Sequence, residues 1–219
     1  MTKEGMVLQD LWDFIEKEIF PFQTSGCIFN QYNEVSEHDL PNGNFIRRDN
    51  LRRYLSHFKS RPAILLVGEA AGYRGCRFSA IPFTSEAHLL AKVPVSGYMS
   101  SGRSTPWVEP SAKLFWHNLK PFSQNFLVWN ALPFHPYQEG NLLSNRTPTK
   151  KEFADHEHLL AGMLDILKPA QIGAIGKQAE SLLLALGHSC AYVRHPSYGG
   201  KREFEEGLKR LFPDAELTR

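Results

Sequence analysis

A carboxylate, an amide and an imidazole each stand at or near the end of a short apolar run in this 219-residue chain. Glu69 follows the run AILLVG, Asn130 closes the run NFLVWN, and His195 lies near the end of CAYVRHP. A carboxylate can orient water or stabilise positive charge, an amide offers a donor and an acceptor together, and an imidazole titrates near neutral pH. These three residue types can serve one reaction if the fold brings them together.

Two glycines and a phenylalanine near the carboxylate indicate what it could act on. Gly68 and Gly72 flank Glu69 in the stretch GEAAG and would let backbone amides approach a ligand closely. Phe83, which ends the same glycine-containing loop, could stack on a planar base, and Asn130 could read a base edge. The alternatives are structural: a tight turn with a solvated glutamate, a core phenylalanine, and an asparagine that caps the next turn.

The segment that follows His195 combines a hydroxyl, two glycines and two cations. The proline after His195 favours extended backbone at the histidine, and Ser197 then offers a hydroxyl. Lys201 and Arg202 open a predicted helix, whose N-terminal amides favour a bound phosphate. A plain helix-entry loop would explain the glycines but not the whole set.

Four apolar runs that alternate with helical patterns predict how these side chains are positioned. The runs are typical of buried strands, at residues 63–68, 125–130, 170–176 and 190–196. Apolar residues at helical spacing predict helices over 85–92, 111–120, 150–167, 177–186 and 201–212. This alternation predicts an α/β fold with a parallel central sheet covered on both faces. Ligands bind beyond the carboxyl ends of such strands, so Glu69, Asn130 and His195 should converge.

The first 60 residues precede this alternation. We expect them to form a helical extension packed on a single domain that spans residues 1–219, with helices over 7–20 and 45–58 and a loop over 21–43.

Two polar clusters on predicted helices have ordinary explanations. The first lies opposite an apolar stripe and is expected to be a solvated helix face, with phosphate binding as the alternative; it comprises Arg47, Arg48, Arg52 and Arg53. The second has neighbours that point in different directions, which indicates a surface feature and no metal site; it comprises His156, Glu157 and His158.

Composition sets limits on the class of protein. Hydrophobic residues make up 42% and charged residues 22%, and the net charge of +2 neither requires nor excludes a polyanionic partner. The three cysteines contain no CxxC pair, which favours a reducing cytoplasm over a disulfide framework. The N-terminus lacks an apolar signal core, and no apolar stretch approaches the length of a membrane span.

With these residues assembled, the chain resembles the uracil-DNA glycosylase superfamily over residues 63–205. The stretch GEAAG is similar to the Gly-Glu-Ala-Pro-Gly first motif of the thermophile-type family 4 enzymes, and IPF at 81–83 lies where they have Arg-Pro-Phe. Residues 129–152 resemble their Asn-containing strand and the Asn-Arg-x-Pro stretch after it, and HPS at 195–197 matches the second motif.

The resemblance implies a three-layer α/β/α fold with a four-stranded parallel sheet, acting on DNA whose damaged base is flipped into a pocket. Phe83 would stack on the base, Asn130 would bind its polar edge, His195 would donate to O2, and Glu69 would position water or stabilise the sugar cation. The other implied contacts are with the base, from Gly68 and Ala70, and with DNA, from Gly72, Ser197, Tyr198 as a wedge, Lys201 and Arg202. We expect a monomer with no cofactor and no metal.

The chain departs from the family patterns at defined positions. Ala71 replaces the proline of the first motif, and the four cysteines of the family 4 iron–sulfur cluster are missing. Family 1 enzymes place an aspartate where Ala70 stands and a thymine-excluding tyrosine where Gly72 stands.

These departures leave two alternatives to a base-excising hydrolase. Ala70 and Ala71 are compatible with a catalytically weak module that binds a damaged base. The modest charge of +2 is compatible with a hydrolase of free nucleosides or nucleotides.

Overall fold

The computed structural model describes residues 3–197 and 199–213. Its central sheet has four parallel strands in the order β3–β2–β5–β6, namely β3 (Phe126–Leu132), β2 (Ile64–Ala70), β5 (Gln171–Ile175) and β6 (Ala191–Val193). A separate antiparallel pair joins β1 (Ile28–Phe29) to β4 (His135–Pro136). The parallel four-stranded sheet confirms the predicted α/β fold.

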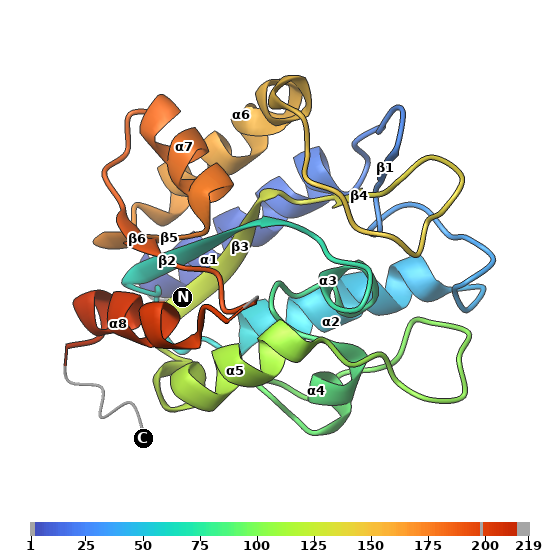
Figure 1. Cartoon of the computed structure of the whole chain (residues 1–219), viewed down its shortest axis with the longest axis horizontal. Helices are drawn as coiled ribbons and strands as arrows, with labels where there is room; N and C mark the ends of the chain where they lie inside the picture. Colours follow the sequence, from blue (N-terminus) through green and yellow to red (C-terminus); the bar gives the residue numbers. More distant parts are fainter. Residues whose placement is uncertain (1–2, 198, 214–219) are drawn as a thin grey trace.

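Helices cover the sheet because its strands are apolar on both faces. All residues of β3 and the first five of β2 are buried, as expected for a parallel sheet between two helical layers. The α-helices that the structure describes are α1 (Lys3–Phe14), α2 (Gly43–Ser56), α3 (Cys76–Ser79), α4 (Glu86–Leu90), α5 (Pro110–Leu119), α6 (Lys150–Leu167), α7 (Lys177–Ala185) and α8 (Lys201–Leu211). Figure 1 shows α6 and α7 on one side of the sheet and α5 and α8 on the other. In the part of the chain that the structure describes, no helix is both long and apolar enough to span a membrane.

The central strands extend further than the sequence pattern predicts. β2 continues two residues past Gly68, because its parallel pairing with β3 continues through Gly68 with Asn130 and Ala70 with Leu132. Glu69 therefore lies within a strand, where its backbone is fixed by the sheet, and not in a turn.

The observed ends of the first helix and of the last strand also differ from the predicted ones. β6 ends at Val193, so His195 lies in the loop after the strand and not within it. The first helix ends at Phe14 and continues as a π-helical turn over Ile15–Ile19. The predicted helix over 150–167 is confirmed by α6, which begins at a capping box between Thr149 and Glu152.

The prediction of a solvated arginine face on α2 is wrong for Arg47. Its guanidinium is fully buried and bonds Asp39, with 2.6 Å between Nη1 and Oδ1. Arg77, equally buried, donates to both oxygens of the same carboxylate, at 2.6 and 2.8 Å. Burial alone would raise the pKa of Asp39, but the hydrogen bonds and charges of the two arginines outweigh it and lower the pKa to about 2. This ion triad joins the segment before α2, which carries Asp39, to α2 and α3.

His156 is likewise buried, contrary to the prediction of a surface cluster. Its Nδ1 lies 2.7 Å from the Glu152 carbonyl oxygen, and its ring packs against Phe22 and Phe134. His158, two residues on, is exposed. The helix therefore uses His156 as a core residue, on the same face as Phe153 and Leu160.

Candidate active site

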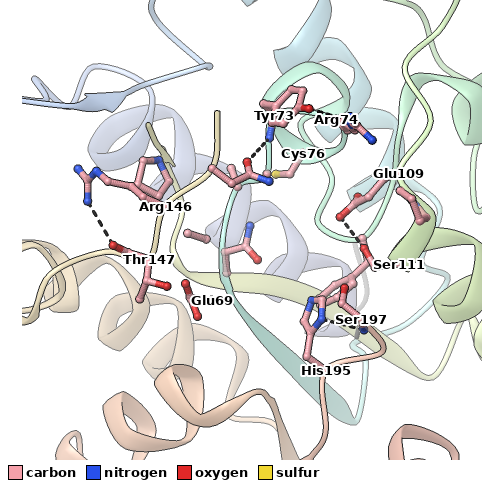
Figure 2. Close-up of a pocket in the computed structure, with 18 of the residues that line it drawn as sticks. Glu69, Tyr73, Arg74, Cys76, Glu109, Ser111, Arg146, Thr147, His195 and Ser197 are labelled. Carbon is pink, nitrogen blue, oxygen red and sulfur yellow. Dashed lines mark hydrogen bonds between the residues drawn. The ribbon is translucent and has the colours of Figure 1, made fainter. Parts of the chain in front are cut away.

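A pocket of about 660 Å³ opens beyond the carboxyl ends of β2 and β3, where the sequence predicts the site (Figure 2). It is lined by five of the predicted side chains, namely Glu69, Phe83, Asn130, His195 and Ser197, and by the backbone around Ala70 and Gly72. The convergence predicted from the ends of three strands is therefore present as one cavity.

Three of the predicted residues are not among those that line this cavity, namely Gly68, Lys201 and Arg202. Lys201 and Arg202 begin α8, are exposed, and lie 3.9 Å from Glu205 and 3.4 Å from Glu206 across one helical turn. Tyr198 lies outside the described residues. Contacts of Tyr198, Lys201 and Arg202 with DNA remain predictions.

Phe83 forms an aromatic wall of the pocket. Its ring stacks on Phe115 with centroids 4.7 Å apart and planes 9° from parallel, and its centroid lies 5.5 Å from that of His195. The residue has φ +51°, a left-handed conformation that is uncommon for a phenylalanine. Because Phe115 holds the ring on one face, its orientation is fixed before a ligand arrives.

Asn130 presents an unpaired amide beside that ring. Its side chain is almost fully buried, lines the pocket, and makes no hydrogen bond to the residues that the structure describes. A buried amide normally finds partners, so a free donor and acceptor here favour a polar ligand.

Gly68 makes room for this arrangement. A Cβ atom at that position would lie 2.7 Å from Oδ1 of Asn130 and 2.9 Å from Cε2 of Phe83. No other residue type fits beneath both groups without moving one of them. The glycine thus acts by sterics, under the amide and the ring.

We predict that Gly68→Ala lowers base release by a factor of at least about ten, because its methyl group displaces Asn130 or Phe83 from the geometry that a bound base requires. The rate of release from a uracil-containing oligonucleotide under single-turnover conditions measures this. Gly102→Ala is the control, since a Cβ there meets nothing closer than 3.5 Å. Equal rates for both variants would contradict the steric role.

His195 is held as a neutral hydrogen-bond donor. The Ser197 backbone N–H donates to His195 Nδ1 at 3.2 Å, so the proton of the neutral ring belongs on Nε2. Burial, with a smaller contribution from the Arg194 charge, lowers the pKa of His195 to about 4. At neutral pH the ring therefore offers an uncharged N–H in the pocket.

Glu69 supplies a carboxyl group from β2. Burial raises the pKa of Glu69 above its usual value, and a hydrogen bond with Thr147 opposes that rise. Figure 2 shows Thr147 next to this carboxyl, on the loop that also carries Arg146. Arg146 donates to both oxygens of Glu152, at 2.8 and 2.6 Å, so the cap of α6 fixes the loop beside Glu69.

Several lining residues were not predicted as site residues. They come from several separate segments of the chain, and they are Tyr73, Arg74, Cys76, Glu109, Ser111, Asn145, Arg146, Thr147 and Arg194. Asn145 accepts from the Tyr73 backbone N–H at 2.9 Å and so ties the loop before α6 to the loop after β2. The Asn-Arg stretch of the family resemblance was the available signal for Asn145 and Arg146, whereas nothing in the sequence pointed to Glu109.

Glu86 explains how the segment 93–110 reaches the pocket. This buried carboxylate accepts from the backbone N–H groups of Ser100, Ser101 and Trp107 and from the Ser101 hydroxyl, at 2.8–3.1 Å. The segment is thereby folded against α4 and returns to the pocket at Glu109.

A metal site needs several ligand side chains close together. Among residues 3–197 and 199–213, no group of three or more His, Cys, Asp or Glu side chains is placed to hold a metal ion.

The fold and the site together define an α/β protein with a pocket at the carboxyl edge of a parallel sheet, lined by aromatic and polar side chains. The sequence model of the family described as "Uracil DNA glycosylase superfamily" matches residues 55–213, and the chain belongs to this superfamily. A search of curated protein sequences finds no match. Among solved structures, the chain is similar to the wild-type SMUG2 protein of Pedobacter heparinus, with a TM-score of 0.70 and 14% identity over 95% of this chain and 97% of that one. At this identity the likeness concerns the fold.

Proposed function

We propose that this protein is a DNA glycosylase that hydrolyses the N-glycosidic bond of uracil, or of a related deaminated base, in DNA. The observation that supports it most is the convergence of Glu69, Phe83, Asn130 and His195 on one cavity. Each of these side chains matches one part of a flipped nucleotide, and the superfamily to which the chain belongs is named for uracil-DNA glycosylase.

In this proposal the base is held first and activated second. Phe83, fixed by Phe115, stacks on the ring, and the free amide of Asn130 pairs with the imide edge, where a donor and an acceptor are adjacent. His195 Nε2–H then donates to O2, where negative charge develops as the bond to the sugar breaks. A neutral donor strengthens its bond as the charge grows, so it stabilises the transition state more than the ground state.

Glu69 acts at the other end of the breaking bond. A carboxylate near the sugar stabilises the positive charge on C1′ and orients the attacking water. The bond between C1′ and the base nitrogen breaks with its electron pair leaving on the base, and the water oxygen bonds to C1′ while its proton is released. This hydrolysis needs only water as the second reactant and no cofactor.

DNA is the proposed partner, bound by a monomer of this chain. Arg74 and Arg194 line the pocket, are exposed, and form no ion pair with described residues, so they can contact phosphates on either side of a flipped nucleotide. Ser197 offers a hydroxyl for the same purpose. Lys201 and Arg202, with carboxylates one turn away, would have to exchange those partners for phosphate.

Incubation with single- and double-stranded oligonucleotides that carry one uracil, followed by alkali, tests this function. Strand scission at the uracil is expected from the wild type. No scission there, and none with hypoxanthine, xanthine or 5-hydroxymethyluracil, would contradict the proposal. Tight, salt-sensitive binding without release would instead favour the binding module. Faster turnover of free deoxyuridine or dUMP would favour the nucleoside hydrolase.

We predict that Glu69→Gln lowers base release by a factor of at least about ten and moves the acid limb of the pH profile to lower pH. The ionised carboxylate is the active form, and burial raises its pKa. Wild-type activity should therefore fall, as pH is lowered, at a higher pH than an ordinary glutamate would give. The activity of the glutamine variant should stay constant as pH is lowered, until His195, whose pKa is about 4, takes a proton. An unchanged acid limb in a kcat/KM profile would rule out Glu69 as its origin.

A further inference from the structure

His135 is a buried histidine close to the pocket, and the proposed reaction does not use it. It begins β4, is fully buried, and is not among the residues that line the cavity. Its backbone pairs with Phe29 of β1 in the small antiparallel sheet. A buried polar side chain normally has hydrogen-bond partners, so the partners of this ring show what the histidine holds in place.

Each ring nitrogen of His135 meets a backbone carbonyl of a different loop. Nδ1 lies 2.7 Å from the carbonyl oxygen of Ala71, in the loop after β2, and Nε2 lies 2.9 Å from that of Leu142, between β4 and α6. Both loops line the pocket. The first follows Glu69, and the second carries Thr147, which hydrogen-bonds with the same carboxyl group. One buried side chain therefore contacts both of the loops that meet at Glu69.

A neutral imidazole can donate to only one of these carbonyls, because it carries one N–H and both partners are acceptors. Burial lowers the pKa of His135 to about 4; the two carbonyl contacts oppose this effect, and the charges of Arg77 and Arg146 add to it. The ring is therefore neutral at pH 7. The contact with Ala71 is the shorter of the two, which favours the proton on Nδ1. In that tautomer the contact with Leu142 is not a hydrogen bond.

Ala71 is the residue at which the chain leaves the sheet. The pairing of β2 with β3 ends at Ala70 and Leu132. Beyond it, the Ala71 N–H donates to the Phe134 carbonyl at 3.2 Å, and the Ala71 carbonyl faces His135. The first motif that this stretch resembles has a proline here, whose ring fixes φ and which has no N–H to donate. In this chain, hydrogen bonds to the segment after β3 hold the same backbone position.

We propose that His135 is a positioning residue for Glu69, which acts through a hydrogen bond from Nδ1–H to the Ala71 carbonyl. The inference rests on the proposed function, in which the Glu69 carboxylate acts at the sugar. Only Ala70 lies between Glu69 and Ala71, so a loosened Ala71 lets the end of β2 move and the carboxyl group with it. A displacement of about 1 Å at a reacting group can cost about 10²-fold in rate.

Two amide variants separate the roles of the two ring nitrogens. The side-chain amide nitrogen of His135→Asn can take the place of Nδ1, whereas that of His135→Gln, one methylene longer, reaches the place of Nε2. Both variants remove the ring, so both should lower the urea midpoint to a similar extent. His135→Asn should keep single-turnover base release within about threefold of the wild type, and His135→Gln should lower it at least about tenfold. Equal losses in both variants, or rescue by glutamine instead of asparagine, overturn the role of Nδ1.

The position of the proton can be measured without any reaction. NMR spectra of the ring nitrogens of the wild type at pH 7 should show the proton of His135 on Nδ1, and a proton on Nε2 overturns the inference. This measurement needs no variant, so it holds even if neither amide variant folds.

Amide hydrogen exchange separates this inference from the proposed function. The Ala71 N–H should exchange faster in His135→Gln than in His135→Asn, and equal exchange in both overturns the anchoring of Ala71. If the wild type releases no base but this difference is present, the glycosylase proposal fails and the anchoring of Ala71 stands. If the wild type releases uracil and the two variants lose activity equally, the glycosylase proposal stands and the role of His135 fails.

Discussion

Replacing His195 with alanine is expected to slow base release by a factor of about 10²–10³, the usual cost of removing one preorganised donor from a developing negative charge. The side chain sits beside the Phe83 ring, and the Ser197 backbone N–H occupies its Nδ1, which leaves Nε2–H for the base. Burial holds its pKa at about 4, so the donor is uncharged at neutral pH. Single-turnover rates at saturating enzyme measure the chemical step without a contribution from DNA binding.

Two further variants make this result specific. His117→Ala removes an exposed histidine of α5 and should change the rate by less than about twofold. His195→Gln keeps an N–H donor on a side chain of different length and should recover part of the lost rate. A threefold or smaller effect of His195→Ala would show that another group stabilises the leaving base, and the mechanism would then have to be reassigned.

The parallel sheet and the position of its ligand site could be predicted because both depend on local patterns. Each apolar run matches one strand, and the carboxyl ends of parallel strands meet at one edge whatever the loops do. Glu69, Asn130 and His195 were found in this way, since each stands at or just beyond such a run. The ends of the strands are harder to predict than their positions in the chain. The pairing of Ala70 with Leu132, for example, depends on the neighbouring strand and not on either sequence alone.

The unpredicted parts of the site depend on contacts between distant segments. Glu109 reaches the pocket because Glu86 gathers the backbone of the segment 93–110, and because Gly75 leaves space for a carboxyl. Nothing in the residues around Glu109 indicates either condition. Arg47 shows the same limit: its helical position indicates solvent, but Asp39, eight residues earlier in the chain, lies where it can bury the charge.

Replacing Asp39 with asparagine is expected to lower the free energy of unfolding by about 3–5 kcal/mol, the usual cost of removing one partner from a buried ion pair. Here one carboxylate serves two buried guanidinium groups, those of Arg47 and Arg77, and both would lose their counter-charge together. Urea unfolding at pH 7 measures the change. Asp49→Asn is the matched control, because its pair with Arg53 on the same helix is exposed to solvent, where an ion pair contributes little to stability.

The pH dependence of stability distinguishes lost charge from lost packing in this variant. The pKa of Asp39 is about 2 in the folded protein and close to 3.8 in an unfolded chain, so the unfolded state binds the proton first as pH falls. The stabilisation from Asp39 is therefore complete above about pH 5 and declines between pH 4 and 2. The difference in unfolding free energy between the wild type and Asp39→Asn should shrink over that window. A difference that stays constant from pH 5 to pH 2 would mean that the variant loses packing and not charge.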